Sequence, residues 1–339
     1  MAEKGYIRRV LKNASFEKLK YTINAAHERS GKSKLAIFLD MVWCLIRYGA
    51  GYYDYLIFAF YDLNAKQRKT YVTRFISKKL NMALNDVDYC HFFDNKDEFY
   101  EKFGQYTGRS FLDLSTATKE DLAAFVEGKE QIFCKLRSKT CGIGCERLNV
   151  KDFADVDALW DYLKEKEFYT IEDVIVPHPD VAKLYSNAVN SMRIITLTDA
   201  KGEVHILYVV HKIGLNGSII DNNCMFAPVD IESERFMYPA HAGDTPLGIV
   251  YTEHPETSIR IPGYKLPMVK EAVAMVKEAA KIVPQVRYVG WDVAATPTGP
   301  VIIEGNTYCA HDFWQLPPHT PDKIGMLPKI KALVPEIKV

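Results

Sequence analysis

Residues 286–306 read VRYVGWDVAATPTGPVIIEGN, and this stretch decides how the 339-residue chain folds. A short apolar strand carries Asp292 at its end, a Thr-Pro-Thr-Gly-Pro turn follows, and a second apolar strand ends in Glu304-Gly305-Asn306. Two strands joined by a tight turn bring their outer ends together. The stretch therefore predicts a β-hairpin with three polar side chains at its open end.

These three side chains, Asp292, Glu304 and Asn306, are candidate metal ligands. Their hard oxygens suit Mg²⁺ that carries nucleotide phosphates. Side chains alternate across a strand, so Glu304 and Asn306 should point to the same face. The alternative is a hairpin with solvent-facing polar residues. We favour the metal, because an acid within a run as apolar as VIIEGN needs a partner or a metal to offset desolvation.

The composition is that of a soluble globular enzyme. The chain is 48% hydrophobic and 25% charged, which is ordinary for such proteins. Its length suggests two to three domains. The formal net charge is zero, so no global field recruits nucleic acid. The sequence also lacks nucleic-acid-binding motifs, and we expect no nucleic-acid partner.

The cysteines favour a reducing compartment. There are seven, an odd number, and no secretory signal precedes them, so we expect reduced thiols and a cytoplasmic protein. Three of them cluster without completing a zinc-binding set, and we expect no zinc there; these are Cys134, Cys141 and Cys145.

The amino-terminal part is basic at first and then strongly apolar. Residues 35–63 are rich in aromatic and aliphatic side chains, but charged residues and two glycines interrupt them. A transmembrane span needs about 20 uninterrupted apolar residues, so we expect a buried helical pair and no transmembrane segment. The alternative is a peripheral membrane contact through the basic first helix and this stretch. The basic residues are Lys4, Arg8, Arg9, Lys12, Lys18 and Lys20.

The order of expected elements indicates an α+β fold. Proline is absent before residue 171, so the amino-terminal half should be dense in helices. Strands then mix with helices, with much antiparallel pairing, which is typical of α+β proteins. Expected helices span 1–30, 35–48, 53–63, 65–84, 118–127, 155–166 and 265–283. Expected strands span 131–137, 147–150, 168–176, 191–199, 203–214 and 217–221.

The hairpin resembles the metal-binding end of the ATP-grasp superfamily, in which an Asp on one strand and a Glu-x-Asn on the next hold the magnesium of ATP. GWDVAATPTGPVIIEGN is more similar still to the sugar-transfer-associated ATP-grasp family, whose members tend to be encoded with polysaccharide genes. The resemblance spans about residues 35 to 317. It implies an ATP-grasp fold, in which two α+β subdomains (91–180 and 181–339) clasp ATP, preceded by a helical portion (1–90).

Two lysines and a glycine loop are candidates for the phosphates of ATP. Lys96 opens an expected helix, where its charge and free N–H groups suit phosphate. Lys135 lies in mid-strand between apolar residues, which is rare for an unpaired lysine. Gly142 and Gly144 let the backbone approach phosphate without Cβ clashes. The family carries two ATP lysines and a glycine loop in these places, so the resemblance implies the same roles here.

The resemblance also implies an adenine hinge in TIEDVI, residues 170–175. Glu172 is the best match to the glutamate of that strand, and Val174 would add main-chain contacts. An acid that binds the ribose usually follows, and Asp180 or His178 could serve.

Arg193 and Lys212 are the candidate catalytic residues. The planar fork of donors on Arg193 suits a phosphate or a carboxylate, and the alternative is a structural ion pair. In the family the arginine of this strand points into the catalytic cleft. Lys212 occupies a position that relatives often fill with arginine. The resemblance also points to Asp221 and Asn222, an Asp-Asn pair that recurs in the family, as residues that shape the pocket for the acceptor or the phosphate.

The sequence departs from many amino-acid-ligating relatives at two places. They carry an arginine two residues before the metal Asp, where this chain has Gly290, and a Pro-Gly turn after Glu-x-Asn, where this chain continues to His311. His311 is a candidate proton acceptor beside the site, although a lone loop histidine is more often a hydrogen-bonding residue.

We expect an ATP- and Mg²⁺-dependent carboxylate–amine ligase that acts through an acylphosphate, with a small-molecule acid and an amine acceptor as substrates. An ATP-grasp kinase that phosphorylates a hydroxyl is the first alternative. A degenerate nucleotide-binding module is the second, and the complete set of metal ligands and lysines argues against it.

Overall fold

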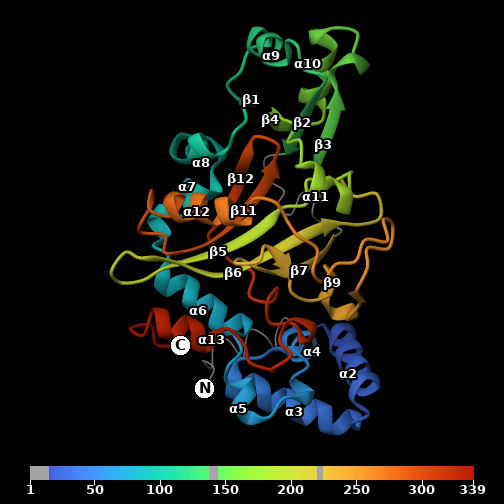
Figure 1. Cartoon of the computed structure of the whole chain (residues 1–339), viewed down its shortest axis with the longest axis vertical. Coiled ribbons are helices and arrows are strands. Elements are labelled where there is room, and N and C mark those ends of the chain that lie inside the picture. Colours follow the sequence, from blue (N-terminus) through green and yellow to red (C-terminus); the bar gives the residue numbers. More distant parts are fainter. Residues whose placement is uncertain (1–14, 137–143, 220–223) are drawn as a thin grey trace.

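Two antiparallel sheets organise the chain in a computed structural model that describes residues 15–136, 144–219 and 224–339. Figure 1 shows three tiers along the long axis: amino-terminal helices at one end, an eight-stranded sheet in the middle and a four-stranded sheet at the other end. The predicted α+β class is confirmed. The domain boundaries at residues 90 and 180 stay a prediction.

The smaller sheet has the order β1-β4-β2-β3 and encloses its own apolar core with two helices. Thr118 caps the first helix through a capping box with Asp121; such caps satisfy free N–H groups of the first turn. The elements are β1 (Phe111–Asp113), α9 (Lys119–Val126), β2 (Gln131–Leu136), β3 (Cys145–Asn149), α10 (Val156–Glu165) and β4 (Phe168–Asp173).

The larger sheet has the order β10-β9-β7-β6-β5-β11-β12, with β8 paired to β7. Its strands are β5 (Met192–Thr198), β6 (Val204–Gly214), β7 (Cys224–Asp230), β8 (Arg235–Phe236), β9 (Ala240–Ala242), β10 (Val250–Tyr251), β11 (Tyr288–Thr296) and β12 (Gly299–Asn306). Side chains alternate between its faces: Ile194 packs in one apolar core and Ile195 in the other.

Helices cover both faces of this sheet. The core that contains Ile194 also contains residues of α7 (His91–Asp94), α8 (Lys96–Phe103), α11 (Pro179–Leu184) and α12 (Val269–Ala279). The core that contains Ile195 is shared with α13 (Leu327–Leu333) and the amino-terminal helices. The latter are α2 (Phe16–Ser30), α3 (Lys34–Tyr48), α4 (Tyr52–Ile57) and α6 (Arg74–Leu84), whereas α5 (Ala65–Arg68) has no buried residue. No described helix is long and apolar enough to cross a membrane.

The prediction of one continuous helix over 65–84 is wrong. The chain is interrupted between α5 and α6, because the side chain of Gln315 bonds the backbone of Val72. Its amide accepts from Val72 N at 2.8 Å and donates to Val72 O at 3.0 Å. A residue 243 positions away therefore takes the peptide groups that a helix would have used.

Other boundaries differ as well. The expected helix 53–63 ends at Ile57 and is followed by a 3₁₀ turn (Phe60–Asp62). The expected strand 217–221 is wrong for residues 217–219, which form a turn with positive φ at Asn216 and Gly217; residues 220 and 221 lie outside the described part. The sequence reading missed β7, whose Pro228 interrupts the strand pattern.

The packing of the amino-terminal helices on the sheet can be tested within α6. Leu80 is 1% exposed in the core shared with the sheet, so Leu80→Ala should lower the free energy of unfolding by about 2–5 kcal/mol. Met82 is 73% exposed on the same helix, so Met82→Ala should stay within about 0.5 kcal/mol of the parent. Urea unfolding measures both. Equal effects of the two changes would contradict the packing.

Candidate active site

The predicted hairpin is confirmed as β11 and β12, joined at Thr296 and Gly299. Thr296 Oγ1 donates to Gly299 O at 2.7 Å and closes the turn. In the register of the two strands Asp292 stands opposite Glu304, and a bulge follows directly because Val293 pairs with Ile302. Ile303 is thus the extra residue of the bulge, which bends and twists the strand next to the site.

A buried cluster of charges sits on the middle of the larger sheet. Arg193 on β5 stands opposite Asp292 on β11, and its guanidinium donates to both carboxylate oxygens, from Nη2 at 2.8 Å. Lys212 Nζ donates to the second oxygen at 3.1 Å. Burial raises the pKa of Asp292, but Arg193 and Lys212 outweigh it and hold that pKa well below its usual range. The structural ion pair considered as the alternative for Arg193 is present, and its partner is the predicted metal ligand.

Glu304 and Asn306 lie beside this cluster at the end of β12. Glu304 is exposed. The side-chain amide of Asn306 donates to Gly290 O at 3.3 Å and to Glu304 Oε1 at 3.2 Å. The two predicted ligands therefore point to the same side, as the alternation of the strand requires.

The donor set of Asp292, Glu304 and Asn306 fits Mg²⁺. All three side chains carry hard oxygens, and the two carboxylates face each other across one strand pair. The oxygens of Asp292 that accept from Arg193 and Lys212 keep further lone pairs. No group of three His, Cys, Asp or Glu side chains in the described ranges could hold a metal, and the candidate set here combines two carboxylates with the amide oxygen of Asn306.

A second, cationic cluster surrounds Glu172 on β4. Lys135 Nζ donates to both oxygens of Glu172 at 2.6 Å, Arg109 Nε donates to one at 3.0 Å, and Lys96 Nζ lies 3.9 Å away. Burial raises the pKa of Glu172, but the charges of Lys135, Arg109 and Lys96 lower it to about 2. Three cations around one carboxylate leave two positive charges in excess.

Lys96 and Glu304 connect the two clusters. Burial, followed by the charge of Lys135, lowers the pKa of Lys96 to about 8, while Glu172 and Glu304 act in the opposite direction. Glu304 also helps to raise the pKa of Arg193. The carboxylate of Glu304 is thus near enough to influence a cation in each cluster. An anionic group bound between them would meet the excess positive charge around Lys96.

The remaining described candidates for nucleotide binding lie outside the two charge clusters. Gly144 stands at the start of β3 with φ +80°, where a Cβ would come within 2.3 Å of Leu136, and Gly142 lies outside the described residues. Val174 follows directly after β4. Asp180 is the second residue of α11 and pairs with Lys183 at 2.7 Å, and among the described residues it contacts no member of either cluster.

Of the candidates for the acceptor substrate, only His311 lies in the described part of the chain. Asp221 and Asn222 lie outside the described residues. His311 is nearly buried, and its Nε2 lies 2.9 Å from Asp54 Oδ1 on α4. Burial lowers the pKa of His311, and the hydrogen bond and charge of Asp54 raise it by more, so the net shift is upward. His311 thus ties the loop after β12 to the amino-terminal helices.

The sequence reading missed this wall of the site. Tyr53 on α4 donates to Asp312 at 3.0 Å, and the guanidinium of Arg193 lies 5.9 Å from the ring of Phe313. The loop therefore contacts Arg193 of the buried charge cluster and rests on α4. One signal was available: Asp54 is an acid within the apolar run YYDYLIFAF, the same criterion that singled out Glu304.

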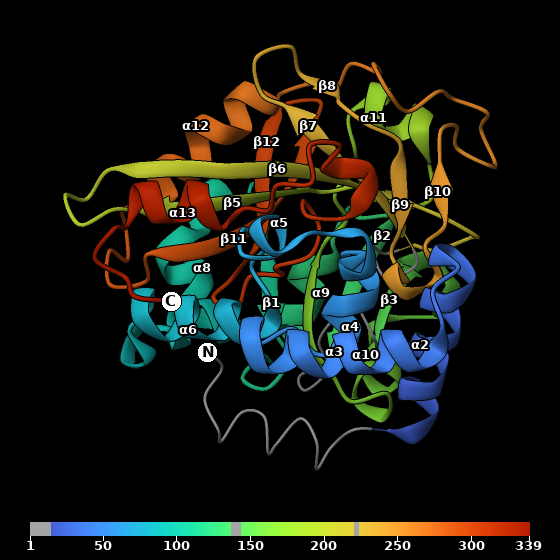
Figure 2. The same cartoon turned by 90° about the horizontal axis from the view of Figure 1, so that it is seen from below.

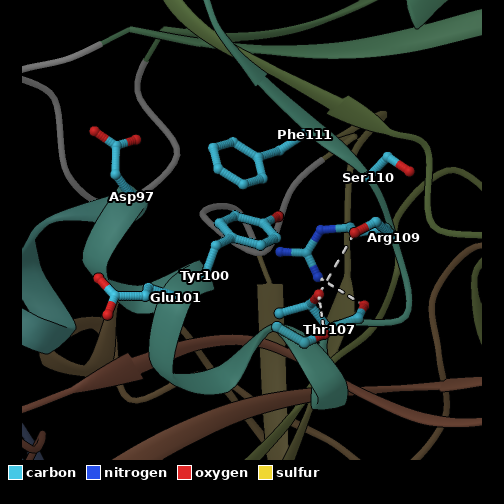
Figure 3. Close-up of a pocket in the computed structure, with 8 residues that line it drawn as sticks. Asp97, Tyr100, Glu101, Thr107, Arg109, Ser110 and Phe111 are labelled. Carbon is cyan, nitrogen blue, oxygen red and sulfur yellow. Dashed lines mark hydrogen bonds between the residues drawn. The ribbon is translucent and has the colours of Figure 1, made fainter.

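Arg109 was also missed, and no local pattern marks it. Besides Glu172, it binds the carbonyls of Ile302 at 2.8 Å and Ile303 at 3.0 Å, at the bulge of β12. Figure 3 shows its guanidinium beside Tyr100, whose ring stacks on Phe111 at 3.9 Å. These residues line an open cavity of about 520 Å³ between α8 and β1. The cavity borders the cationic cluster through Arg109 and contains none of the predicted site residues.

Comparison with known proteins identifies one family. The family model "sugar-transfer associated ATP-grasp" matches residues 137–324. A search of curated proteins finds no match.

Several solved structures are similar at low identity. The ATP-grasp ligase PsnB in complex with a precursor variant, Mg and ADP is 11% identical, with a TM-score of 0.40, over 69% of this chain and 58% of that one. D-alanyl-alanine synthetase A from Vibrio cholerae is 14% identical, with a TM-score of 0.40, over 67% and 60%. The macrocyclase MdnC from Microcystis aeruginosa, bound to its precursor peptide MdnA, is 13% identical, with a TM-score of 0.42, over 79% and 72%. The chain thus spans about 60% of the first two, and these similarities carry no inference about substrates.

The pair between His311 and Asp54 predicts a pH-dependent contribution to stability. The pKa of His311 is raised in the folded protein, so its contribution is complete below the ordinary value near 6.5 and is lost as the pH rises through the folded value. His311→Gln should therefore lower the free energy of unfolding by more at pH 6 than at pH 9, as measured by urea unfolding. In an Asp54→Asn background, the effect of His311→Gln on the free energy of unfolding should be nearly the same at both pH values. An effect of His311→Gln that grows with pH in the parent would contradict the pairing.

Proposed function

Since the chain belongs to the sugar-transfer associated ATP-grasp family, we propose that it is an ATP- and Mg²⁺-dependent carboxylate–amine ligase. The proposal rests mainly on one observation: at the hairpin end Glu304 stands opposite Asp292, which belongs to the buried Arg193–Asp292–Lys212 cluster. The charge of Glu304 also acts on Lys96, in the cluster that has an excess of positive charge. A polyphosphate bound beside Glu304 would meet the excess positive charge around Lys96. Its reacting end would lie beside the fixed cations Arg193 and Lys212. The substrates would be a small acid, a peptide or a sugar-linked acid, together with an amine.

In this proposal the nucleotide lies against the smaller sheet. Lys96 and Lys135 bind its phosphates, Glu172 holds the two lysines in place, and Val174 provides main-chain contacts at the hinge. The lowered pKa of Lys96, about 8, fits this role. Lys96 shares Glu172 with Lys135 and Arg109, and a partly desolvated cation whose charge is only partly compensated gains more from a bound anion than a solvated lysine does.

Asp292, Glu304 and Asn306 would hold the Mg²⁺, which would neutralise phosphate oxygens. Arg193 and Lys212 stabilise the charge of the γ-phosphoryl group as it transfers. They are fixed before the reaction by their bonds to Asp292, so no reorganisation is needed.

The proposed chemistry has two steps. A carboxylate oxygen of the acid attacks the γ-phosphorus, and the bond from that phosphorus to the bridging oxygen of ADP breaks, which gives an acylphosphate and ADP. The amine nitrogen then attacks the acyl carbon, the carbon–oxygen bond to phosphate breaks, and the amine loses a proton. An amide and inorganic phosphate result. No covalent enzyme nucleophile is required.

A kinase is the second candidate, and Gly290 favours it. Many amino-acid-ligating relatives carry an arginine at this position. Here a Cβ on residue 290 would already approach Ile195 at 3.0 Å, Arg193 at 3.3 Å and Cys309 at 3.5 Å. The space for an arginine side chain is thus taken, in part by Arg193 itself. Phosphoryl transfer to a hydroxyl would stop after the first step and would not need that arginine.

The metal site can be tested with Glu304→Gln. Because Glu304 is exposed, the change should leave the fold and melting temperature unaltered. It should abolish most of the gain in ADP affinity that Mg²⁺ provides, and it should lower ATP turnover by roughly 100-fold or more. Titration calorimetry with and without Mg²⁺ measures the change in ADP affinity. Glu203→Gln, at another exposed carboxylate, is the control. A Glu304→Gln protein with the parent's Mg²⁺ dependence would refute the metal assignment.

Hydroxylamine separates the ligase from the kinase. The protein would be incubated with ATP, Mg²⁺, hydroxylamine and a panel of amino acids, peptides and uronic acids. A ligase should yield a hydroxamate of its acid substrate, with one ADP and one phosphate per hydroxamate, because hydroxylamine intercepts the acylphosphate. A kinase would instead form a stable phosphorylated product that hydroxylamine leaves intact, with one ADP for each. Mass spectrometry of the products decides between them.

A further inference from the structure

The outer face of α3 is an apolar surface on the described part of the molecule. Six large side chains are exposed on this helix at intervals of three or four residues, with Leu35 at 69%, Leu39 at 59% and Trp43 at 56% exposure. Such intervals place residues on one side of a helix. We call this set the α3 face; it consists of Leu35, Phe38, Leu39, Val42, Trp43 and Ile46.

The helix is held firmly from its other side. Ile37, Met41 and Cys44 of α3 are buried in the core that the amino-terminal helices share with the larger sheet. Asp40 is turned away from the α3 face as well, because Arg68 donates to both of its oxygens at 2.7 Å and Tyr55 donates at 2.9 Å. The α3 face is therefore a rigid feature of the fold and carries no carboxylate.

The charges around the α3 face are basic. The exposed charged residues of α3 are Lys34 at its start and Arg47 at its end. Residues 15–84 contain twelve Lys and Arg but only five Asp and Glu, a formal charge of +7 in a chain whose net charge is zero. The protein is thus polarised, with its positive charge concentrated in the helices that carry the apolar surface.

The position of α3 leaves the candidate active site accessible. Figure 1 places α3 at the end of the long axis opposite the four-stranded sheet, and Figure 2 shows it running along the side that faces the viewer from below. A partner on the α3 face would thus lie far from the cationic cluster around Glu172.

We propose that the α3 face docks on an anionic lipid surface, with α3 lying in the plane of the headgroups. A helix with a wide apolar side that includes Trp and Phe, and with basic residues at its margins, suits the boundary between headgroups and acyl chains. The positive charge of residues 15–84 adds attraction to anionic headgroups. Pairing with a second copy through the same face is disfavoured, because it would bring two regions of charge +7 together. The proposal is independent of the reaction catalysed.

The test is co-sedimentation of the full chain with vesicles. Vesicles of phosphatidylcholine alone would be compared with vesicles that contain about 30% phosphatidylglycerol. We expect binding to the anionic vesicles that weakens as salt is raised, and at least about tenfold weaker partitioning to the neutral ones. The double variant Leu39→Ser, Trp43→Ser should lose about tenfold or more of this binding.

Two controls make the result specific. Val87 is 79% exposed outside residues 15–84, and Val87→Ser should bind like the parent. Circular dichroism and melting temperature should be unchanged in both serine variants, because all three side chains are exposed. The double variant Lys34→Glu, Arg47→Glu should weaken binding to anionic vesicles but not to neutral ones.

Three outcomes would overturn the proposal. The first is equal partitioning to neutral and anionic vesicles, or to neither. The second is the same loss of binding in Val87→Ser as in Leu39→Ser, Trp43→Ser. The third is a lipid-free dimer in light scattering that the Leu39→Ser, Trp43→Ser change dissociates, which would assign the α3 face to self-association.

Discussion

The buried carboxylate of Asp292 is the group on which the candidate site depends. A charge placed in the middle of a sheet must be paired, or its desolvation would outweigh the folding free energy. Arg193 and Lys212 supply that pairing from the two strands on one side, β5 and β6. On the other side stands Glu304, exposed at the end of β12 and opposite Asp292. Four neighbouring strands thus hold two fixed cations and two carboxylates close together, an arrangement that supports the proposed phosphoryl transfer with a divalent metal.

Arg109 connects the two sheets. Its guanidinium joins Glu172 in the smaller sheet to the backbone of Ile302 and Ile303 in the larger one. The bulge of β12 leaves Ile303 without a partner across the strand pair, and Arg109 takes up its carbonyl. Arg109 therefore links the lysine cluster directly to the strand that carries Glu304. Its replacement would disturb both clusters at once.

The amino-terminal helices have different roles on their inner and outer faces. Their inner faces complete the core of the larger sheet, and α4 supports the loop over Arg193 through the Asp54–His311 and Tyr53–Asp312 contacts. Their outer surface, on α3, concentrates apolar area and positive charge away from the site. The same portion of the chain thus shapes the wall of the cleft in the ATP-grasp fold and offers a surface for a partner.

The sequence by itself determined the hairpin and the α+β class, because turn residues, strand alternation and acids within apolar runs are local signals. The family followed from the resemblance of residues 290–306 to known ATP-grasp sequences. It also singled out the residues of both charge clusters except Arg109. Only the tertiary structure decided where helix 65–84 breaks, since Gln315 binds Val72 from the far end of the chain. The same holds for the bonds of Arg109 to β12 and for the pairing of Asp54 with His311. Each of these contacts joins residues far apart in the chain, and no local pattern encodes which distant partner a polar group will meet once the two sheets have packed.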